Sequence, residues 1–303
     1  MLNTDYKLFT KIIANRISSV LQKILGPGQV ACLENKSCID NLRNIRRLIT
    51  RSMENRRMKG FLVSLDLQKA FDSVCHTYLW KILGKVGFPD TLIDCLKNMY
   101  SKATSRILFN GFLTNEIQIQ SSVRQGCPLS MVLFVIYIEP LIRKLQSSIT
   151  GLLVYDKFLT VMAYADTLTV FIQNAQEFDL MLQIINSYSN RAMIKLNNRK
   201  SSFIRLNSCS GGPFEIKEVK KQKNLGVVIA SKRTEIVNET YNCLIKSLNG
   251  QLINKRMRNM NLVDRTVYLN VFILSKLWYV SQVFPPSNEQ LAKIKKIVGQ
   301  FFF

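Results

Sequence analysis

Two aspartates have the clearest potential for chemistry. Asp66 lies in the apolar run Phe61–Leu67, which predicts a buried strand, and Asp166 separates the apolar runs Phe158–Tyr164 and Leu168–Ile172. A carboxylate at a buried strand is costly unless it meets a cation. If these strands pair, both carboxylates converge on one sheet edge, where two Mg²⁺ ions would support phosphoryl transfer. The alternative is an ordinary edge residue and an ordinary turn aspartate.

The charge of the chain points to a polyanionic partner. Its 303 residues carry 42 Lys and Arg against 20 Asp and Glu, a formal net charge of +22. Residues 1–60 hold 12 basic and 4 acidic side chains, residues 61–190 hold 10 of each, and residues 191–303 hold 20 and 6. Two basic ends therefore flank a neutral middle. A solvated surface is the simpler explanation, but an excess of this size favours nucleic-acid binding.

Other features exclude several classes of protein. His76 is the single histidine, and no CxxC pair occurs among the seven cysteines, so a Cys/His zinc knuckle cannot be built. The start has no signal-peptide pattern, and no uncharged apolar stretch reaches about 18 residues. We expect a protein that is not secreted, without a membrane span, in a reducing intracellular compartment, either nucleus or cytoplasm.

Hydrophobic periodicity predicts an α+β chain. A first hairpin is expected around Asn110-Gly111, with a loop longer than two residues, and a second has Asp166 at its tip. From Glu235 onward the pattern is helical, with breaks near Asn259–Asn261 and at Pro285-Pro286. The remaining expected elements are helices over 4–25, 37–58, 77–87, 89–101, 129–145 and 177–193, and strands over 203–206 and 225–229.

Several sequence blocks occur in an order typical of one family. They are 61–74 around Asp66, 123–130 (Val-Arg-Gln-Gly-Cys-Pro-Leu-Ser), 163–170 around Tyr-Ala-Asp-Thr, 195–201 and 224–227, with Leu2–Lys7 before them and Ser275–Tyr279 after them. Together they resemble the reverse transcriptases of non-LTR (LINE-type) retrotransposons. A group II intron maturase shares the central blocks, but the Asp-Leu-Gln-Lys-Ala-Phe-Asp block and the Ser-Lys-Leu-Trp-Tyr segment favour the retrotransposon side.

The resemblance implies a right-hand polymerase fold. Residues 1–60 would be partial fingers, residues 61–233 a palm with fingers elements and a small antiparallel sheet, and residues 234–303 a helical thumb. The implied activity is RNA-directed DNA polymerisation, which extends a DNA primer on an RNA template with dNTPs. The implied cofactor is a pair of Mg²⁺ ions, with Mn²⁺ as a substitute.

The resemblance also implies roles for the catalytic and primer-binding residues. Asp66 and Asp166 would bind the metal ions. Lys200 would be the general acid for the leaving pyrophosphate, although a solvated lysine is the alternative in so basic a region. Leu225 and Gly226 would lie under the primer end.

Four further residues would contact the nucleotide or the template. Phe71 would be the steric gate against a ribose 2′-hydroxyl, with plain core packing as the alternative. Gln125 would bind near the incoming sugar and template, and Gly126 would permit close backbone approach. Arg124 would lie beside them, with a cation that positions phosphate or stabilises the fold as the alternative.

Departures from the family pattern predict weak or absent catalysis. Thr167 stands where the family has a second aspartate, and a neutral threonine cannot supply an anionic oxygen to Mg²⁺. The fingers segment expected before residue 2, the upstream endonuclease and the downstream Cys/His element are not recognised. The alternative function is therefore an inactive relic of the same fold that binds RNA or an RNA–DNA duplex. Smaller departures occur at Cys32, Lys36, Ser122, Met131 and Asn224.

Overall fold

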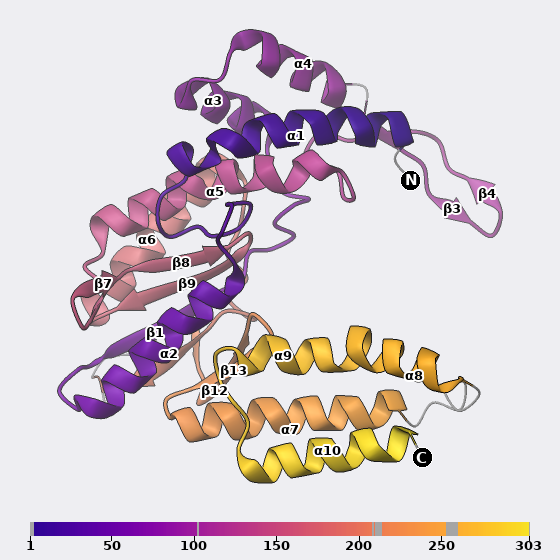
Figure 1. Cartoon of the computed structure of the whole chain (residues 1–303). Helices are drawn as coiled ribbons and strands as arrows, with labels where there is room; N and C mark the ends of the chain where they lie inside the picture. Colours follow the sequence, from indigo (N-terminus) through magenta and orange to yellow (C-terminus); the bar gives the residue numbers. More distant parts are fainter. Residues whose placement is uncertain (1–2, 102, 208, 210–213, 253–259, 303) are drawn as a thin grey trace.

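A mixed sheet with helices on both faces forms the centre of the molecule, and a bundle of C-terminal helices lies beside it (Figure 1). No helix among the described residues is long and apolar enough to span a membrane. The computed structural model describes residues 3–101, 103–207, 209, 214–252 and 260–302.

The central sheet has five strands in the order β11-β10-β1-β9-β8. Strand β1 pairs antiparallel with β10 on one side and β9 on the other, and β8 pairs antiparallel with β9. Parallel pairing of β10 with β11 completes the sheet. The strands are β1 Gly60–Leu65, β8 Val161–Tyr164, β9 Thr167–Ile172, β10 Ser202–Leu206 and β11 Lys217–Glu218.

Successive side chains of the central strand β1 point alternately into two hydrophobic cores. Phe61, Val63 and Leu65 lie in one core, whereas Leu62 lies in the other. Because successive side chains of a strand point to opposite faces, a strand that is buried on both faces reads as an uninterrupted apolar run. This burial explains why the sequence Gly60–Leu65 is continuously apolar except for Ser64.

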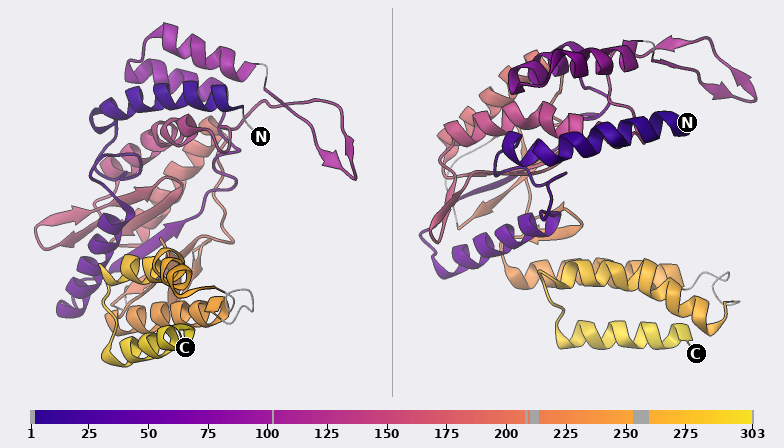
Figure 2. Two further views of the ribbon diagram at one scale, coloured as in Figure 1. Left: turned by 45° about the vertical axis from the view of Figure 1, so that its right-hand side comes forward. Right: turned by 45° about the horizontal axis from the view of Figure 1, so that its top comes forward.

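Helices cover both faces of the sheet (Figures 1 and 2). Helices α5 and α6 pack on the Phe61 side, with α1 and α3 outside α5 and α4 against α3. Helix α2, helix α7 and the hairpin β12–β13 close the other side. The elements are α1 Thr4–Ile24, α2 Cys38–Glu54, α3 His76–Val86, α4 Asp90–Ser101, α5 Pro128–Ser148, α6 Ala175–Ala192, β12 Lys221–Asn224 and β13 Val227–Ala230.

The C-terminal helices form a layer of their own below the sheet in Figure 1. Helix α7 (Arg233–Leu252) packs on β13 and on α10 (Asn288–Phe302). The chain between α7 and α10 forms one continuous helical rod. It consists of α8 (Leu262–Tyr268), a π-helical segment (Leu269–Leu274) and α9 (Ser275–Ser281). The predicted break at Pro285-Pro286 is confirmed, whereas Asn259 of the other predicted break lies outside the described residues.

Three local predictions are wrong. Strand β1 ends at Leu65, so Asp66 follows the strand instead of lying in it. Leu225 belongs to the two-residue turn between β12 and β13, since the strands end at Asn224 and resume at Val227. The loop at Asn110-Gly111 has two residues, because Phe109 pairs directly with Phe112. Positive φ at Asn110 (46°) and Gly111 (85°) is the conformation that such short hairpin loops require.

The Asn110-Gly111 hairpin projects from the body of the molecule (Figures 1 and 2). Its inner pair is β3 (Leu108–Phe109) with β4 (Phe112–Leu113), and its base pairs β2 (Thr104–Ser105) with β5 (Ile117–Gln118). A further hairpin, β6 (Leu152–Val154) with β7 (Lys157–Leu159), leads into β8. Thr160 interrupts the run that the sequence predicted as one strand over 158–164.

Removing the ring of Phe61 tests the sheet core. Phe61 is fully buried, with edge-on contacts to Phe178 and Phe203. We expect Phe61→Ala to lower the free energy of unfolding by about 3–5 kcal/mol, because the substitution leaves a cavity. Urea denaturation measures the change. Phe109→Ala, at a ring that is 71% exposed, is the matched control and should change it by less than about 0.5 kcal/mol. Similar losses in both variants would contradict this account.

Candidate active site

The register of the sheet brings Asp66 and Asp166 to the same edge. Leu65, the last residue of β1, pairs with Leu168 of β9, so Asp66 lies beside the start of β9. Tyr164 pairs with Thr167 across the β8–β9 hairpin, which leaves Ala165 and Asp166 as its two-residue tip. The predicted convergence of the two carboxylates thus follows from strand pairing.

Asp66 is held by the segment that precedes β10. The Asn197 side-chain amide donates to Asp66 Oδ2 at 3.0 Å, and the Asn197 backbone N–H donates to the Asp66 carbonyl at 2.8 Å. The Asp66 backbone N–H donates to Ser201 Oγ at 3.0 Å. One carboxylate oxygen of Asp66 therefore has a fixed partner in the protein, and the other has none among the described hydrogen bonds.

The position of Asp166 depends on the unusual backbone conformation of the preceding residue, Ala165. Ala165 has φ 53° and is buried, a conformation that non-glycine residues rarely adopt. The Gln29 side chain brackets this residue: its Oε1 accepts from the Ala165 N–H at 3.2 Å, and its Nε2 lies 3.5 Å from the Ala165 carbonyl as donor. Because Gln29 is fully buried, the turn that carries Asp166 is anchored from inside the protein.

The loop that carries Gln29 is itself fixed to the edge strand β8 and to helix α5. The Ala163 N–H donates to the Gly28 carbonyl at 2.7 Å, and the Val30 N–H donates back to the Ala163 carbonyl. Glu139 of α5 accepts from the Gly26 N–H at 2.7 Å and from Arg143 at 2.8 Å. The loop thereby covers an otherwise open strand edge. Burial raises the pKa of Glu139, and these two hydrogen bonds oppose that rise.

The electrostatics at the edge suit a cation. Burial raises the pKa of Asp166, and the negative charge of Asp66 raises it further. A divalent ion between the carboxylates would offset both effects. Among the described residues no cluster of three or more His, Cys, Asp or Glu side chains is present. Two carboxylates thus fit a divalent ion, while Thr167, the first residue of β9, adds no charge to the donor set.

The first and second sequence blocks meet beside Asp66. Gln125 Nε2 donates to Asp72 Oδ1 at 3.1 Å, and the Val123 N–H donates to the Phe71 carbonyl at 2.9 Å. The half-buried Phe71 ring stacks on Phe134, with centroids 4.5 Å apart. One side of Phe71 therefore packs in the core, and the residue is still partly accessible on the surface, which is compatible with either predicted role.

Arg124 and Gly126 face different surroundings. The Arg124 guanidinium donates to the Met99 carbonyl at 2.8 Å and lies over the Tyr6 ring at 4.7 Å. These contacts favour the fold-stabilising alternative for Arg124. Gly126 has φ 79° with open space where a Cβ would lie, which leaves its backbone accessible.

Lys200 lies in the turn that follows Asn197. Its backbone N–H donates to the Asn197 carbonyl at 3.1 Å, and its side chain is exposed. Since Asn197 binds Asp66 directly, the turn places Lys200 at the edge of the site. The general-acid role stays a prediction.

Leu225 and Gly226 form the tip of a hairpin that helix α9 and the central sheet hold together. Their φ values are 46° and 80°. The Tyr279 hydroxyl of α9 donates to the Leu225 carbonyl at 2.8 Å, while Asn224 Nδ2 donates to Thr169 Oγ1 of β9 at 2.8 Å. Burial raises the pKa of Tyr279, as does its contact with Cys38, and Tyr164 of the β8–β9 hairpin adds a smaller effect. The tip thus lies in the neighbourhood of β8.

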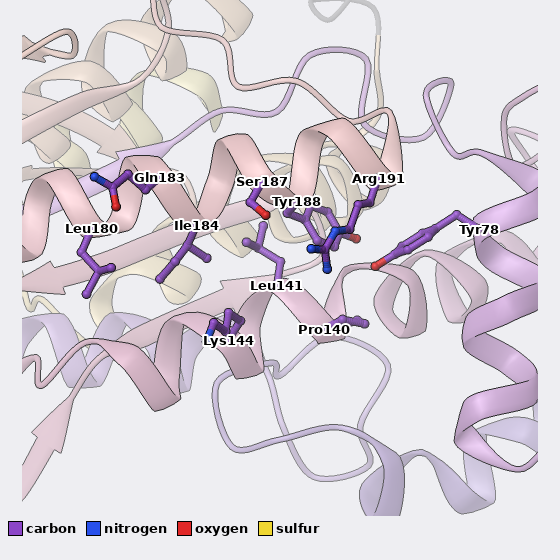
Figure 3. A pocket seen from close by; sticks show the side chains of 10 residues that line it. All are labelled: Tyr78, Pro140, Leu141, Lys144, Leu180, Gln183, Ile184, Ser187, Tyr188 and Arg191. Carbon is purple, nitrogen blue, oxygen red and sulfur yellow. The ribbon is translucent and has the colours of Figure 1, made fainter.

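A cavity of about 550 Å³ lies elsewhere, between α5 and α6 (Figure 3). Tyr78, Lys144 and Arg191 are on its rim, over a floor that includes Leu141 and Ile184. Its described lining residues include no carboxylate, so it is a poor candidate for the metal site.

Gln29 and Tyr279 are the important residues that sequence reasoning left without a role at the site. A signal existed for Gln29, since it is a polar residue between Gly-Pro-Gly and the apolar pair Val30-Ala31. Tyr279 belonged to a thumb segment that the resemblance had identified. Its hydrogen bond to Leu225 joins residues 54 positions apart and could not be read from local pattern.

Comparison with known proteins agrees with this geometry. The reverse transcriptase (RNA-dependent DNA polymerase) family matches residues 1–229. The chain is 28% identical over 314 residues to the transposon TX1 uncharacterized 149 kDa protein of Xenopus laevis, covering 100% of the chain and 24% of that protein. It is 29% identical over 189 residues to the retrovirus-related Pol polyprotein from type-2 retrotransposable element R2DM of Drosophila melanogaster, covering 62% and 18%. The chain thus spans about a quarter or less of these relatives.

Solved structures confirm the fold. Telomerase from Candida tropicalis, in complex with a fragment of telomeric RNA, matches with a TM-score of 0.56 at 11% identity, covering 98% of this chain and 51% of that one. Telomerase from Candida albicans matches with a TM-score of 0.52 at 10% identity, covering 97% and 51%. The predicted right-hand polymerase fold is therefore confirmed.

Replacing Gln29 tests the anchor of the Asp166 turn. Gln29→Met keeps the side-chain length but leaves the N–H groups of Ala31 and Ala165 without an acceptor. We expect the free energy of unfolding to fall by about 2–4 kcal/mol, measured by urea denaturation. Gln22→Met is the control, because Gln22 is exposed and has only a 3.4 Å bond to the Glu34 carbonyl. No difference between the variants would refute the anchoring role.

Removing one hydroxyl tests the link from the thumb to the β12–β13 turn. Tyr279→Phe loses the bond to the Leu225 carbonyl and should cost about 1 kcal/mol. Amide exchange should rise at the turn, which hydrogen–deuterium exchange can measure. In the control Tyr155→Phe, the hydroxyl has no described partner, so stability should be unchanged. Unaltered exchange at Leu225–Val227 in Tyr279→Phe would count against the link.

Proposed function

This chain belongs to the reverse transcriptase (RNA-dependent DNA polymerase) family, and we propose that it is the polymerase domain of a non-LTR retrotransposon Pol protein. In this role it extends a DNA primer on an RNA template. The single observation that carries the proposal is the meeting of Asp66 and Asp166 at one sheet edge, which the β1–β9 and β8–β9 registers produce. We further propose that the protein works inside the cell, in the nucleus or the cytoplasm.

The residues around that edge have distinct roles in the proposal. Asp66 and Asp166 would hold the divalent ions, whose chemistry would be to activate the primer hydroxyl and to neutralise charge on the triphosphate. Asn197 orients Asp66, and Gln29 fixes the turn of Asp166. Lys200, exposed beside Asn197, delivers a proton to the leaving pyrophosphate. Phe71, Gln125 and the open backbone at Gly126 receive the nucleotide and the template.

The charge distribution supports nucleic-acid partners. The middle of the chain, residues 61–190, is neutral, whereas residues 191–303 carry 20 basic and 6 acidic side chains. Residues 191–233 hold 11 of the basic and 2 of the acidic side chains, and the thumb, residues 234–303, holds 9 and 4. Both regions therefore supply positive charge that contacts backbone phosphates, without reading sequence. The turn Leu225-Gly226, tied to thumb residue Tyr279, supports the primer end.

Thr167 favours a second candidate function, namely binding without turnover. It occupies the first position of β9, directly after Asp166, and contributes no anionic oxygen. A metal site with one carboxylate fewer binds Mg²⁺ less tightly and stabilises less charge in the transition state. In this alternative the same fold holds RNA or an RNA–DNA duplex through its basic surfaces.

Restoring the missing carboxylate separates the two functions. We expect primer extension on an RNA template to be slow for the unaltered chain and to rise about 100-fold or more in Thr167→Asp, because the carboxylate adds charge at the metal site. The assay measures single-turnover dNTP incorporation with Mg²⁺ and with Mn²⁺.

Thr167→Asn is the size-matched neutral control and should remain slow, and Asp66→Ala should abolish extension. Fast extension by the unaltered chain would show that Thr167 is tolerated. Extension by Asp66→Ala would overturn the assignment of the metal site. If no variant extends a primer while RNA still binds, the binding function replaces the polymerase.

A further inference from the structure

A basic cleft lies at the far end of the sheet from the two catalytic aspartates. It has a volume of about 400 Å³ and opens between the end of α2, the loop that leads into β1, and β6. Lys59 precedes β1 and Asp66 follows it, so six strand residues, roughly 20 Å, separate the cleft from the carboxylates. The cleft is therefore distinct from the active site.

The polar groups of the cleft are suited to phosphate. Arg51, Arg57 and Lys59 line it, and its described lining residues include no carboxylate. Arg57 and Lys59 are exposed, and their side chains form no hydrogen bond or carboxylate ion pair in the described part of the chain. The carboxylate contact described for Arg51 is a 3.8 Å approach to exposed Glu54. Asn174, whose Oδ1 caps α6, also lines the cleft. Its side-chain N–H groups donate in none of the described hydrogen bonds.

An exposed apolar surface adjoins these cations. Leu153, which lines the cleft, pairs across the β6–β7 hairpin with Phe158, so the two side chains share one face. Leu153, Tyr155 and Phe158 are 48%, 49% and 55% exposed. The Arg51 guanidinium lies over the Tyr155 ring at 5.4 Å. Exposed apolar side chains and cations thus lie next to one another at this end of the sheet.

Cations beside accessible aromatic rings are the chemistry that binds single-stranded nucleic acid. Phosphates contact the cations, and unpaired bases stack on the rings, whereas the bases of a duplex are already stacked on one another. We propose that Arg51, Arg57 and Lys59, together with Tyr155 and Phe158, form a binding surface for a single strand outside the polymerase cleft. This site does not depend on polymerase activity.

The test is the affinity for a fluorescein-labelled single-stranded RNA 20-mer, measured by anisotropy over a range of salt. The double variant Arg57→Glu/Lys59→Glu should weaken binding about 10-fold, and the slope of log K against log salt should fall by about 1.4. Phe158→Ala should weaken binding about 5-fold or more with the slope unchanged, because it removes stacking and not charge.

Lys81→Glu/Lys85→Glu is the matched control. It makes the same change in net charge at exposed positions of α3, which packs on α5 on the other side of the sheet. Its affinity should stay within about twofold of the unaltered chain. Equal weakening in both double variants would show that only overall charge matters, and that result overturns the proposal. A thermal melt of each variant confirms that the fold is retained.

Two further arms identify the ligand and the place. The same titration with single-stranded DNA shows which strand the surface binds, because that strand loses affinity in the cleft variants. If neither RNA nor DNA loses affinity specifically in these variants, the proposal is overturned. RNA that carries 4-thiouridine should photo-crosslink to the β6–β7 hairpin in the presence of excess unlabelled primer–template hybrid. Complete loss of that crosslink under excess hybrid would place all binding in the polymerase cleft.

Discussion

Two like charges held at one edge of a sheet are the constraint on which the rest of the structure depends. Asp66 and Asp166 repel each other, and that repulsion contributes to the raised pKa of Asp166. Strand pairing alone would let the hairpin tip swing away from Asp66. The surroundings oppose this movement with directed hydrogen bonds: Asn197 and Ser201 fix Asp66, and Gln29 fixes the turn of Asp166. The site is therefore prepared for a cation by groups that bear no charge.

The buried amide of Gln29 shows how the helical layer controls that edge. Its oxygen serves two backbone N–H groups, those of Ala31 and Ala165, so one side chain joins the loop after α1 to the catalytic turn. Glu139 of α5 holds the same loop at Gly26. The position of α5 is thereby transmitted to Asp166 through consecutive hydrogen bonds. On the other face of the sheet, Tyr279 links helix α9 to the Leu225 turn in a similar way.

The sequence predicted the elements well where their signal was local. Continuous apolar runs marked β1 and β9, and Gly-Pro-Gly marked the end of α1. Pairing of the apolar runs that flank Asp66 and Asp166 was the basis for expecting the two carboxylates to meet. The ends of the strands were harder to predict from sequence. Leu225, for example, is apolar like a strand residue but lies in a turn with φ 46°. The residues next to Arg124 in the sequence do not predict that its guanidinium lies over the Tyr6 ring, because that contact depends on how α1 packs.

The fold explains why the middle of the chain is neutral while its two ends are basic. The neutral middle contains the site where metal ions would supply positive charge, and a high density of Lys and Arg there would compete with them for the carboxylates. Many of the basic residues lie on α2, on the loop before β1 and on the C-terminal helices, and Lys200 lies at the edge of the site. A long polyanion can contact these regions at once. The arrangement therefore suits a ligand that extends across the molecule, such as a nucleic-acid strand.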